Sequence, residues 1–330
     1  MIAFLLSRLA SAAVVMATVA LVSFAIFNFL GDPVNNILGV NATLAQRDEL
    51  RVALGLDQPT IVQFWRFLER AVTGDFGISY RNRQPVLDLI LARLPATLEL
   101  VLVATLIALA FGVPLGIYTA LRPSGAPTRI LQAFSLVGIS MPQFLIGMLL
   151  ILVFAVELRW LSAFGRGEVV RIGWWTTGLL TVSGLKALIM PAITLAVFQL
   201  SMIMRLVRSE MLEVVRADFV KFARARGLPD RAVYLRHALR NSLLPVITIT
   251  GLQLGAIIAF AIVTETVFQW PGMGLLFIQS VQYADIPVMA AYLMLIALLF
   301  VVINLVVDLL YYAVDPRLRI DRGPARAGGH

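Results

Sequence analysis

The amino-acid sequence predicts an all-α, polytopic membrane protein with six transmembrane helices and an external insertion after the first helix. Its 330 residues are 60% hydrophobic and only 14% charged. A soluble domain of this size cannot bury so much apolar surface, so the bilayer must be its solvent. The chain also contains charge-free runs, each about long enough to cross a hydrocarbon core of ~30 Å at 1.5 Å per residue. These runs are 9–30, 100–121, 130–156, 187–204, 241–264 and 286–307.

The first helix, within residues 1–30, is expected to be a retained signal anchor. Its charge-free run has 22 residues. A cleavable signal peptide has an apolar region of only about 7–15 residues, and no small-x-small cleavage site follows at 31–40.

The external insertion, 31–95, is expected to carry two short amphipathic helices. One lies around Leu44–Leu56, and the second, at 60–72, presents Phe64 and Trp65 among polar residues. Its role is either that of a lid or docking surface, or simply packing on the ends of the membrane helices. Further along, residues 172–185 are apolar but too short to span, and Trp174 and Trp175 suit a membrane interface.

The remaining regions follow from charge. Residues 96–318 form a core of five spans interrupted by a charged loop at 208–240, and 319–330 form a polar tail. Nine Lys or Arg residues against four acids in 205–240, with further arginines in 122–129 and the tail, place these segments and both termini in the cytoplasm. The insertion balances seven Arg against seven acids, and long segments are translocated largely regardless of charge.

The loop at 208–240 has internal order. Residues 211–226 are predicted to form a helix, Gly227 to supply a left-handed C-terminal cap, and Pro229 to end the helix. Asp230 is then expected to cap a second helix at 231–242. Two short helices joined by this turn would form a rigid surface feature.

Several functions are excluded by what the sequence lacks. It has no P-loop, no nucleophile elbow and no H-E-x-x-H motif, so we expect neither ATP binding nor enzyme activity in this chain. It has no cysteine, and His237 and His330 are its only histidines, so no metal site or other cofactor is expected. The net charge of +8 comes from membrane-flanking residues and does not indicate a nucleic-acid partner.

Three interpretations of the loop remain open from composition. It could be a solvated positive-inside loop, although this leaves unexplained the alternation of apolar and basic residues. It could be a peripheral helix that binds anionic lipid. It could also be a docking element for a cytoplasmic protein.

The loop resembles the cytoplasmic "EAA" loop of binding-protein-dependent ABC importer permeases, in particular the peptide-importer branch. The matching stretches are Ala223-Arg224-Ala225-Arg226-Gly227-Leu228 and Arg236-His237-Ala238-Leu239-Arg240-Asn241-Ser242-Leu243-Leu244-Pro245. Compared with the general pattern, Lys221 replaces the acidic residue and Arg240 stands where proline is expected. The resemblance covers nearly the whole chain and includes Gly74-Asp75-Phe76-Gly77, Arg93–Leu100, Glu265–Phe268, Trp270–Gly274 and Asn304–Tyr311.

The resemblance implies one of two homologous permease subunits of a dipeptide or oligopeptide importer in a bacterial inner membrane. The expected partners are the second permease, cytoplasmic ATP-binding subunits, an external substrate-binding protein and the lipid bilayer. Related importers carry glutathione, nickel chelates or oligosaccharides, and the substrate-binding residues are not identified by the sequence. When the ATP-binding subunits close, the loop is expected to tilt helices four and five. The residues expected to dock the ATPase are Phe219, Phe222, Ala223, Gly227, Leu228, Asp230, Arg236, His237, Leu239 and Arg240.

A stand-alone transporter and a membrane-embedded enzyme are the two alternatives to an importer permease. A stand-alone channel or secondary transporter needs ionisable groups at mid-membrane, whereas the charges here cluster at the ends of the spans. A membrane-embedded enzyme needs a catalytic constellation that the sequence does not show. Glu265 and Asp308 lie near span ends and are as compatible with structural as with functional roles, and Pro114, Pro142 and Pro191 are candidates for helix kinks.

Overall fold

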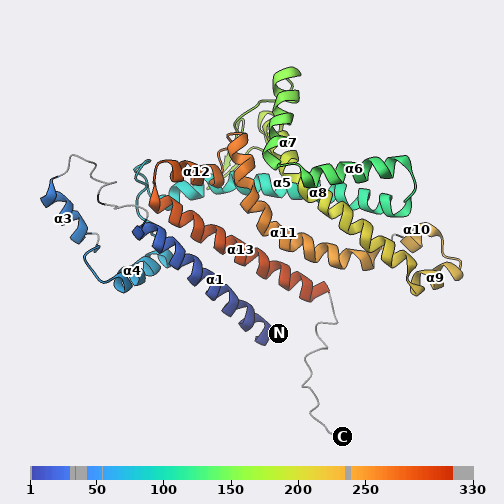
Figure 1. Ribbon diagram of the computed structural model, residues 1–330, viewed down its shortest axis with the longest axis horizontal. Coiled ribbons are helices and arrows are strands. Elements are labelled where there is room, and N and C mark those ends of the chain that lie inside the picture. Colours follow the sequence, from blue (N-terminus) through green and yellow to red (C-terminus); the bar gives the residue numbers. More distant parts are fainter. Residues whose placement is uncertain (1, 30–33, 35–42, 54, 235–238, 315–330) are drawn as a thin grey trace, which may run out of the picture. The chain divides into compact units, whose positions relative to one another are not determined.

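The computed structural model describes residues 2–29, 34, 43–53, 55–234 and 239–314 (Figure 1). Within this part of the chain nearly all regular structure is helical, which confirms the all-α class. The chain forms two compact units, each assembled from three separate stretches. The first unit comprises 1–99, 164–187 and 261–301, and the second comprises 100–163, 188–260 and 302–330.

The first unit contains the N-terminal helix, the insertion and parts of later helices. Its own elements are α1 (Ile2–Phe29), α3 (Leu44–Ala53), α4 (Thr60–Thr73), β1 (Val170–Ile172), β2 (Trp175–Thr177) and α12 (Met273–Gln282). It also holds the first part of α5 (Val86–Leu121) and of α13 (Ile286–Val314), and the last part of α11 (Leu239–Val267).

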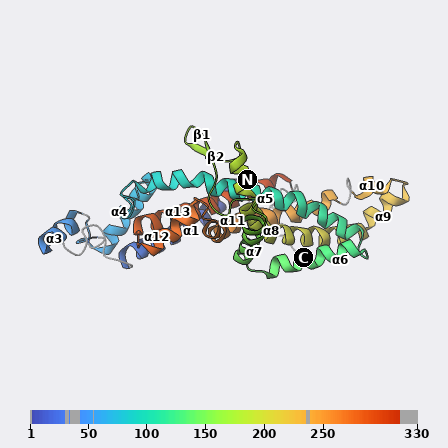
Figure 2. The same ribbon diagram turned by 90° about the horizontal axis from the view of Figure 1, so that it is seen from above.

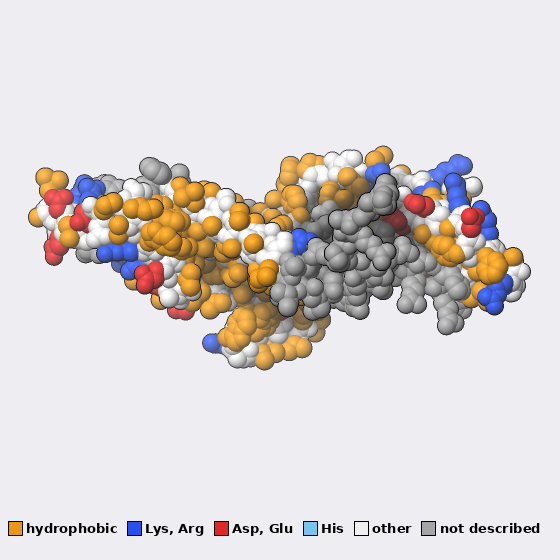
Figure 3. Space-filling model, turned by 90° about the horizontal axis from the view of Figure 1, so that it is seen from below, with side chains coloured by type: hydrophobic (Ala, Val, Ile, Leu, Met, Phe, Trp, Pro, Cys, Tyr) orange, Lys and Arg blue, Asp and Glu red, His pale blue; other side chains and the backbone are white. Residues whose placement is uncertain are grey.

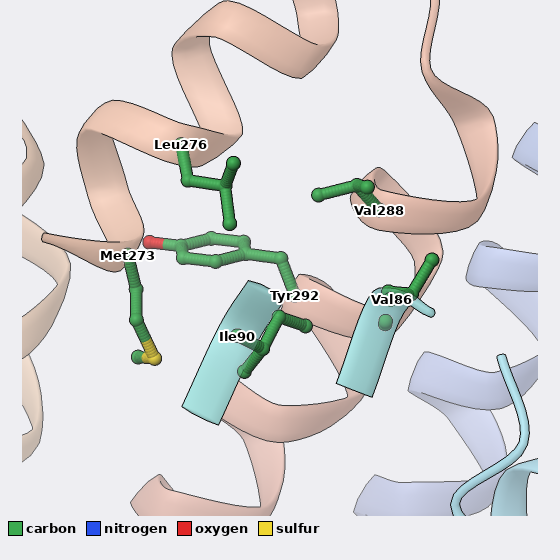
Figure 4. Packing of buried hydrophobic residues seen from close by; sticks show 7 residues of the cluster. Val86, Ile90, Met273, Leu276, Val288 and Tyr292 are labelled. Atoms are coloured by element: carbon green, nitrogen blue, oxygen red, sulfur yellow. The ribbon is translucent and has the colours of Figure 1, made fainter. Parts of the chain in front are cut away.

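The core of the first unit is apolar and draws on three helices. Tyr292 of α13 lies between Leu276 of α12 and Ile90 of α5, and Val86 and Val288 close the cluster (Figure 4). The ring of Phe277 stacks on Tyr292 at a centroid distance of 4.4 Å. Because these side chains come from distant parts of the sequence, their burial fixes the start of α5 against α12 and α13.

The two amphipathic helices expected in the insertion are present as α3 and α4. On α4, Phe64 and Phe67 pack against Phe24 of α1 at centroid distances of 5.4 and 5.9 Å. Trp65, on the other face of α4, is 62% exposed. The helix therefore packs against a membrane helix and still presents an aromatic residue outward.

The loop between α4 and α5 is held by a buried carboxylate. Asp285 is 1% exposed and accepts hydrogen bonds from the Ser79 hydroxyl and from the backbone N–H groups of Tyr80 (3.0 Å) and Arg81 (3.4 Å). Burial, together with the nearby Asp285 carboxylate, raises the pKa of Tyr80 to about 12. The guanidinium of Arg81 lies 3.6 Å above the ring of Tyr283. This part of the insertion is thus ordered by contacts with the start of α13.

Residues 170–177 overlap the apolar segment 172–185 that was expected to be too short to span. They form a two-stranded antiparallel hairpin in which Ile172 pairs with Trp175 and Gly173 makes the turn with a φ of +63°. Trp174 at the turn is 63% exposed, in keeping with an interfacial position, and the next helix already begins at Val182.

The second unit contains the remaining parts of the long helices and the charged loop. Its own elements are α6 (Ala126–Ser140), α7 (Gln143–Leu150), the π-helical continuation η1 (Ile151–Glu157), α9 (Asp218–Ala225) and α10 (Asp230–Ala232). It also holds most of α8 (Val182–Arg216) and the remaining parts of α5, α11 and α13. Figures 1 and 2 both show α9 and α10 next to the C-terminal end of α8.

The run at 130–156 is bent at Pro142, one of the positions where the sequence indicated a kink. The chain turns by 111° between α6 and the α7–η1 helix. Pro142 stands at the break as the N-cap of α7, and because proline cannot donate a backbone hydrogen bond, helix α6 ends before it. Of the three prolines considered, Pro142 marks this bend and Pro191 lies inside the continuous helix α8.

Most of the expected spans correspond to long apolar helices. Among the described residues, α1, α5, α8 and α13 are each long and apolar enough to cross a membrane, and the bent pair makes a fifth candidate. Helix α11 has 29 residues, of which the described apolar part is Gly255–Val267. The crossing by α11, the sixth in the sequence-based count, stays a prediction. Residues 319–330 lie outside the described residues.

Candidate functional site

The first helix of the charged loop differs from the sequence-based expectation. Instead of one helix over 211–226, α8 runs through to Arg216 and α9 begins at Asp218. Ala217 has an extended backbone (φ −67°, ψ 150°), and its carbonyl accepts from the N–H groups of Val220 and Lys221. Helical periodicity continues across this bend, so the apolar pattern alone did not reveal the break.

The turn after α9 has the left-handed glycine expected at position 227. Gly227 has a φ of +77°. Its N–H donates to the carbonyl of Arg224 (2.9 Å), and the N–H of Leu228 donates to that of Ala223 (3.4 Å). These two bonds define a Schellman motif, in which the residue at the glycine position must be left-handed. The cap is confirmed.

Asp230 does not cap the second helix as expected. Pro229 is the N-cap of α10 without a side-chain bond, and Asp230 is the first helical residue. Its carboxylate instead lies 3.7 Å from Nε of Arg224, whose Nη2 donates to the hydroxyl of Tyr234 (2.7 Å). Arg224 therefore ties α9 to α10. Helix α10 ends at Ala232, and residues 235–238 of the expected second helix lie outside the described residues.

The loop has a small apolar core of its own. Val220, Ala223 and Val233 are 0%, 6% and 0% exposed, and Val214 near the end of α8 packs against them. Ala223, expected among the docking residues, is therefore an interior residue of the loop. Its small side chain lets α9 approach α10 closely.

The neighbouring face of α9 is aromatic and exposed. Phe219 and Phe222 are 45% and 64% exposed, and Leu228 in the turn is 38% exposed. Arg226 lies 5.9 Å from the ring of Phe222. Figure 3 shows Lys and Arg side chains beside apolar ones at the right-hand end, where α9 and α10 lie. Aromatic residues rimmed by arginine are typical of protein–protein contact surfaces.

The remaining expected docking residues lie at the start of α11 or outside the described residues. Leu239 is the first residue of α11 and is half-buried, and Arg240 follows it in the same helix. Arg236 and His237 lie outside the described residues.

The first unit contains two buried polar clusters that the sequence did not predict. Arg166 pairs with Glu99 at 2.5 Å, with the two side chains 7% and 3% exposed, and also donates to the carbonyl of Thr176 (2.7 Å). Glu265 is fully buried and accepts from the Thr97 hydroxyl (2.5 Å) and the N–H of Leu275 (2.9 Å). Glu99 and Glu265 each stand at the end of an apolar run, which marked them as candidates. Their partners could not be found from the sequence, because Arg166 lies 67 residues from Glu99 and Thr97 lies 168 residues from Glu265.

Glu265 acts on a helix terminus. Leu275 belongs to the first turn of α12, so the carboxylate satisfies N–H groups that have no partner within that helix. Gly272 leaves space for it, because a β-carbon there would overlap the carboxylate. Glu265 therefore has a structural role in joining α11 to α12.

Asp308, the other carboxylate near the end of a span, lies partly buried in α13.

These features define an all-helical polytopic membrane protein with a packed, partly aromatic two-helix loop between two of its long helices. The chain belongs to the family described as binding-protein-dependent transport system inner membrane component, which matches residues 112–320. The N-terminal region described for the membrane components of such transport systems matches residues 1–101.

Named relatives resemble the chain over nearly its whole length. It is 37% identical to the dipeptide transport system permease protein DppB of Alkalihalophilus pseudofirmus, with 97% of this chain and 100% of that protein covered. It is 39% identical to the glutathione transport system permease protein GsiC of Escherichia coli strain K12, with 92% and 95% covered.

Solved structures support the fold. An inward-facing structure of the MetNI methionine ABC transporter matches with a TM-score of 0.55 and 18% identity, covering 69% of this chain and 96% of that one. A second crystal form matches with a TM-score of 0.51 and 19% identity, covering 67% and 93%.

Proposed function

We propose that this chain forms half of the translocation pathway of an ATP-driven importer that takes up dipeptides or oligopeptides. It acts as a permease subunit, paired with a second homologous permease and supplied by an external binding protein. Family membership over most of the chain and 37% identity to a dipeptide permease support this function. ATP is hydrolysed by separate subunits, in keeping with the missing P-loop.

The part of the 208–240 loop that follows α8 is the contact with the ATP-binding subunits. The observation that carries this assignment is its division into two faces. Val220, Ala223 and Val233 form an interior that holds the two short helices together, while Phe219 and Phe222 point outward. A loop that only carried positive charge would need neither the interior nor exposed aromatic residues.

The geometry explains how the loop can transmit movement. The Schellman motif at Gly227 and the Arg224 contacts make α9 and α10 one body, and α9 follows α8 after a single extended residue. Phe219, Phe222 and Leu228 serve as the anchors of the contact, and the basic residues around them tune docking. When the ATPases close, the displacement of this body passes into α8.

A second candidate substrate, glutathione, is supported by sequence similarity. The chain is as similar to a glutathione permease (39% identity) as to a dipeptide permease (37%). Glutathione is itself a short peptide, so the two candidates differ only within one chemical class. Uptake of labelled dipeptide, challenged by excess oligopeptide or glutathione, distinguishes them.

The test is a mild-detergent pull-down of the tagged chain, with identification of its partners and an ATPase assay. We expect recovery of a second permease and one or two ATPases, and loss of the ATPases from the variants Gly227→Val and Leu228→Glu. Arg205→Gln is the matched control, because Arg205 is exposed on α8 before the loop begins. Recovery of the chain without any ATPase in several detergents would instead indicate a stand-alone transporter.

A further inference from the structure

Helix α8 joins the membrane to the proposed coupling loop without interruption. It has 35 residues, far more than the 18 of the charge-free run at 187–204, and it ends at Arg216. Its C-terminal part packs against α9 through Val214. What α8 contacts therefore decides which other helices follow the loop.

Helix α8 lies against α5 at unusually close range. A β-carbon on Gly116 would lie 2.6 Å from Cβ of Val207 and 2.8 Å from the carbonyl oxygen of Met204. One turn away, a β-carbon on Gly112 would lie 3.0 Å from Cγ2 of Ile203. Glycines four residues apart allow helix backbones to approach closely in membranes. The two helices are thus in backbone contact.

Helix α6 joins the same assembly. Gly138 faces Ser201 of α8, whose hydroxyl oxygen would overlap a β-carbon at that glycine, and Val197 lies 3.0 Å from the same point. Ser201 is fully buried. Figure 1 shows the C-terminal end of α6 close to α8.

Arg208 connects all three helices with one side chain. Its Nη1 donates to the carbonyl of Thr119, which lies in the last turn of α5. With the amide oxygen of Gln132 on α6 turned toward the guanidinium, Nε and Nη2 both donate to it at 2.9 Å. The last carbonyls of a helix lack partners and favour a positive charge, so this placement is stabilising. Only a planar guanidinium reaches both acceptors at once.

We propose that α8, α6 and the part of α5 after residue 99 move as one body when the loop is displaced, and that Arg208 is the positioning residue that couples them. This rests on the proposed function of the loop. Arg208 lies eight residues before the end of α8, about 12 Å at 1.5 Å per residue, close to where the displacement enters. The close glycine contacts then leave no room for α8 to slide alone. Helices two and three therefore move together with helix four, in addition to the tilting of helices four and five expected from the sequence.

The test uses the complete importer in proteoliposomes, with uptake and ATP hydrolysis measured together. Arg208→Met and Gln132→Leu should retain bound ATPase and its hydrolysis while transport per ATP falls about tenfold, within the usual range of coupling energies. Gln132→Glu should transport normally, because a carboxylate still accepts both guanidinium bonds. Gly116→Ala should uncouple like Arg208→Met. Arg205→Met and Gly125→Ala are controls, because Arg205 is exposed and a β-carbon at Gly125 meets nothing closer than 3.6 Å.

A distance measurement separates coupling from simple stability. The chain has no cysteine, so spin labels can be attached at Ile130→Cys on α6 and Glu213→Cys on α8, both exposed. We expect this distance to be the same in nucleotide-free and ATP-trapped importer, and to change between states in Arg208→Met.

Each outcome has a separate meaning. If the wild-type distance changes between the two states while transport is normal, the one-body proposal is wrong and the proposed function stands. The one-body proposal is also wrong if Arg208→Met and Gln132→Leu transport normally. If no ATPase associates with the wild-type chain at all, the proposed function itself fails.

Discussion

Gly227 illustrates how a single residue controls the loop. A β-carbon at this position would meet nothing within 4 Å, so a larger side chain would not be excluded by a steric clash. The requirement comes from the backbone, because a φ of +77° is strained for most L-residues. The two hydrogen bonds of the Schellman motif exist only with this backbone, and they set the angle between α9 and α10.

Replacing Gly227 by Val should therefore abolish transport while leaving membrane insertion intact. A β-branched side chain resists the left-handed region, whereas Gly227→Asn, which tolerates it, should keep most of the activity. Uptake assays and membrane fractionation of both variants check this. Normal uptake by the valine variant would rule out the cap as the element that keeps the loop rigid.

The buried pair of Glu99 and Arg166 makes a different residue-scale prediction. Glu99→Leu and Arg166→Met should each lower stability by about 3–5 kcal/mol, because each leaves its buried partner uncompensated. The double variant Glu99→Leu with Arg166→Met should recover much of that loss. Unfolding in detergent, followed as a function of denaturant, measures the three variants, and additive losses in the double variant would contradict the coupling.

At the scale of elements, carboxylates from one element hold the start of another. Asp285 binds backbone N–H groups of the 79–81 loop, and Glu265 binds those in the first turn of α12. Both are explained by unpaired backbone donors that must be satisfied when buried. Sequence periodicity located the helices but not these contacts, because the donors and acceptors lie far apart in the chain.

The substitution Asp285→Ala should loosen the 79–86 loop without unfolding the helices. The amides of Tyr80 and Arg81 lose their acceptor, so their hydrogen exchange should become at least about tenfold faster, as local opening requires less free energy. Amides within α5 should be unchanged and serve as the internal reference. Equal acceleration throughout α5 would show that Asp285 supports the whole unit instead of the loop.

For the molecule as a whole, the orientation in the membrane is the prediction that follows from its charge. With both termini in the cytoplasm, the 122–129 loop lies inside and the 170–177 hairpin outside. In intact cells, a membrane-impermeant maleimide should label Trp174→Cys and spare Ala126→Cys, both exposed positions in a chain without cysteine. Permeabilised cells should label both, and the reverse pattern would invert the topology.

The sequence alone was sufficient for the class of protein, most of its long helices and the left-handed glycine of the loop. These depend on apolar run length and on local backbone chemistry, which nearby residues encode. Tertiary structure decided the rest. The bend at Ala217, the interior position of Ala223 and the pairing of Asp230 with Arg224 depend on packing between α8, α9 and α10.

The same distinction applies to the contacts of helix α8. Its charged C-terminal third, 205–216, lies outside the charge-free run but remains helical because Val207 and Met211 are buried and Arg208 finds acceptors on two other helices. A charge-free run marks only the part of a helix that lies in hydrocarbon, since charged residues end a span but not a helix. Which helices move with the loop is decided by contacts between residues distant in sequence, and those exist only in the folded chain.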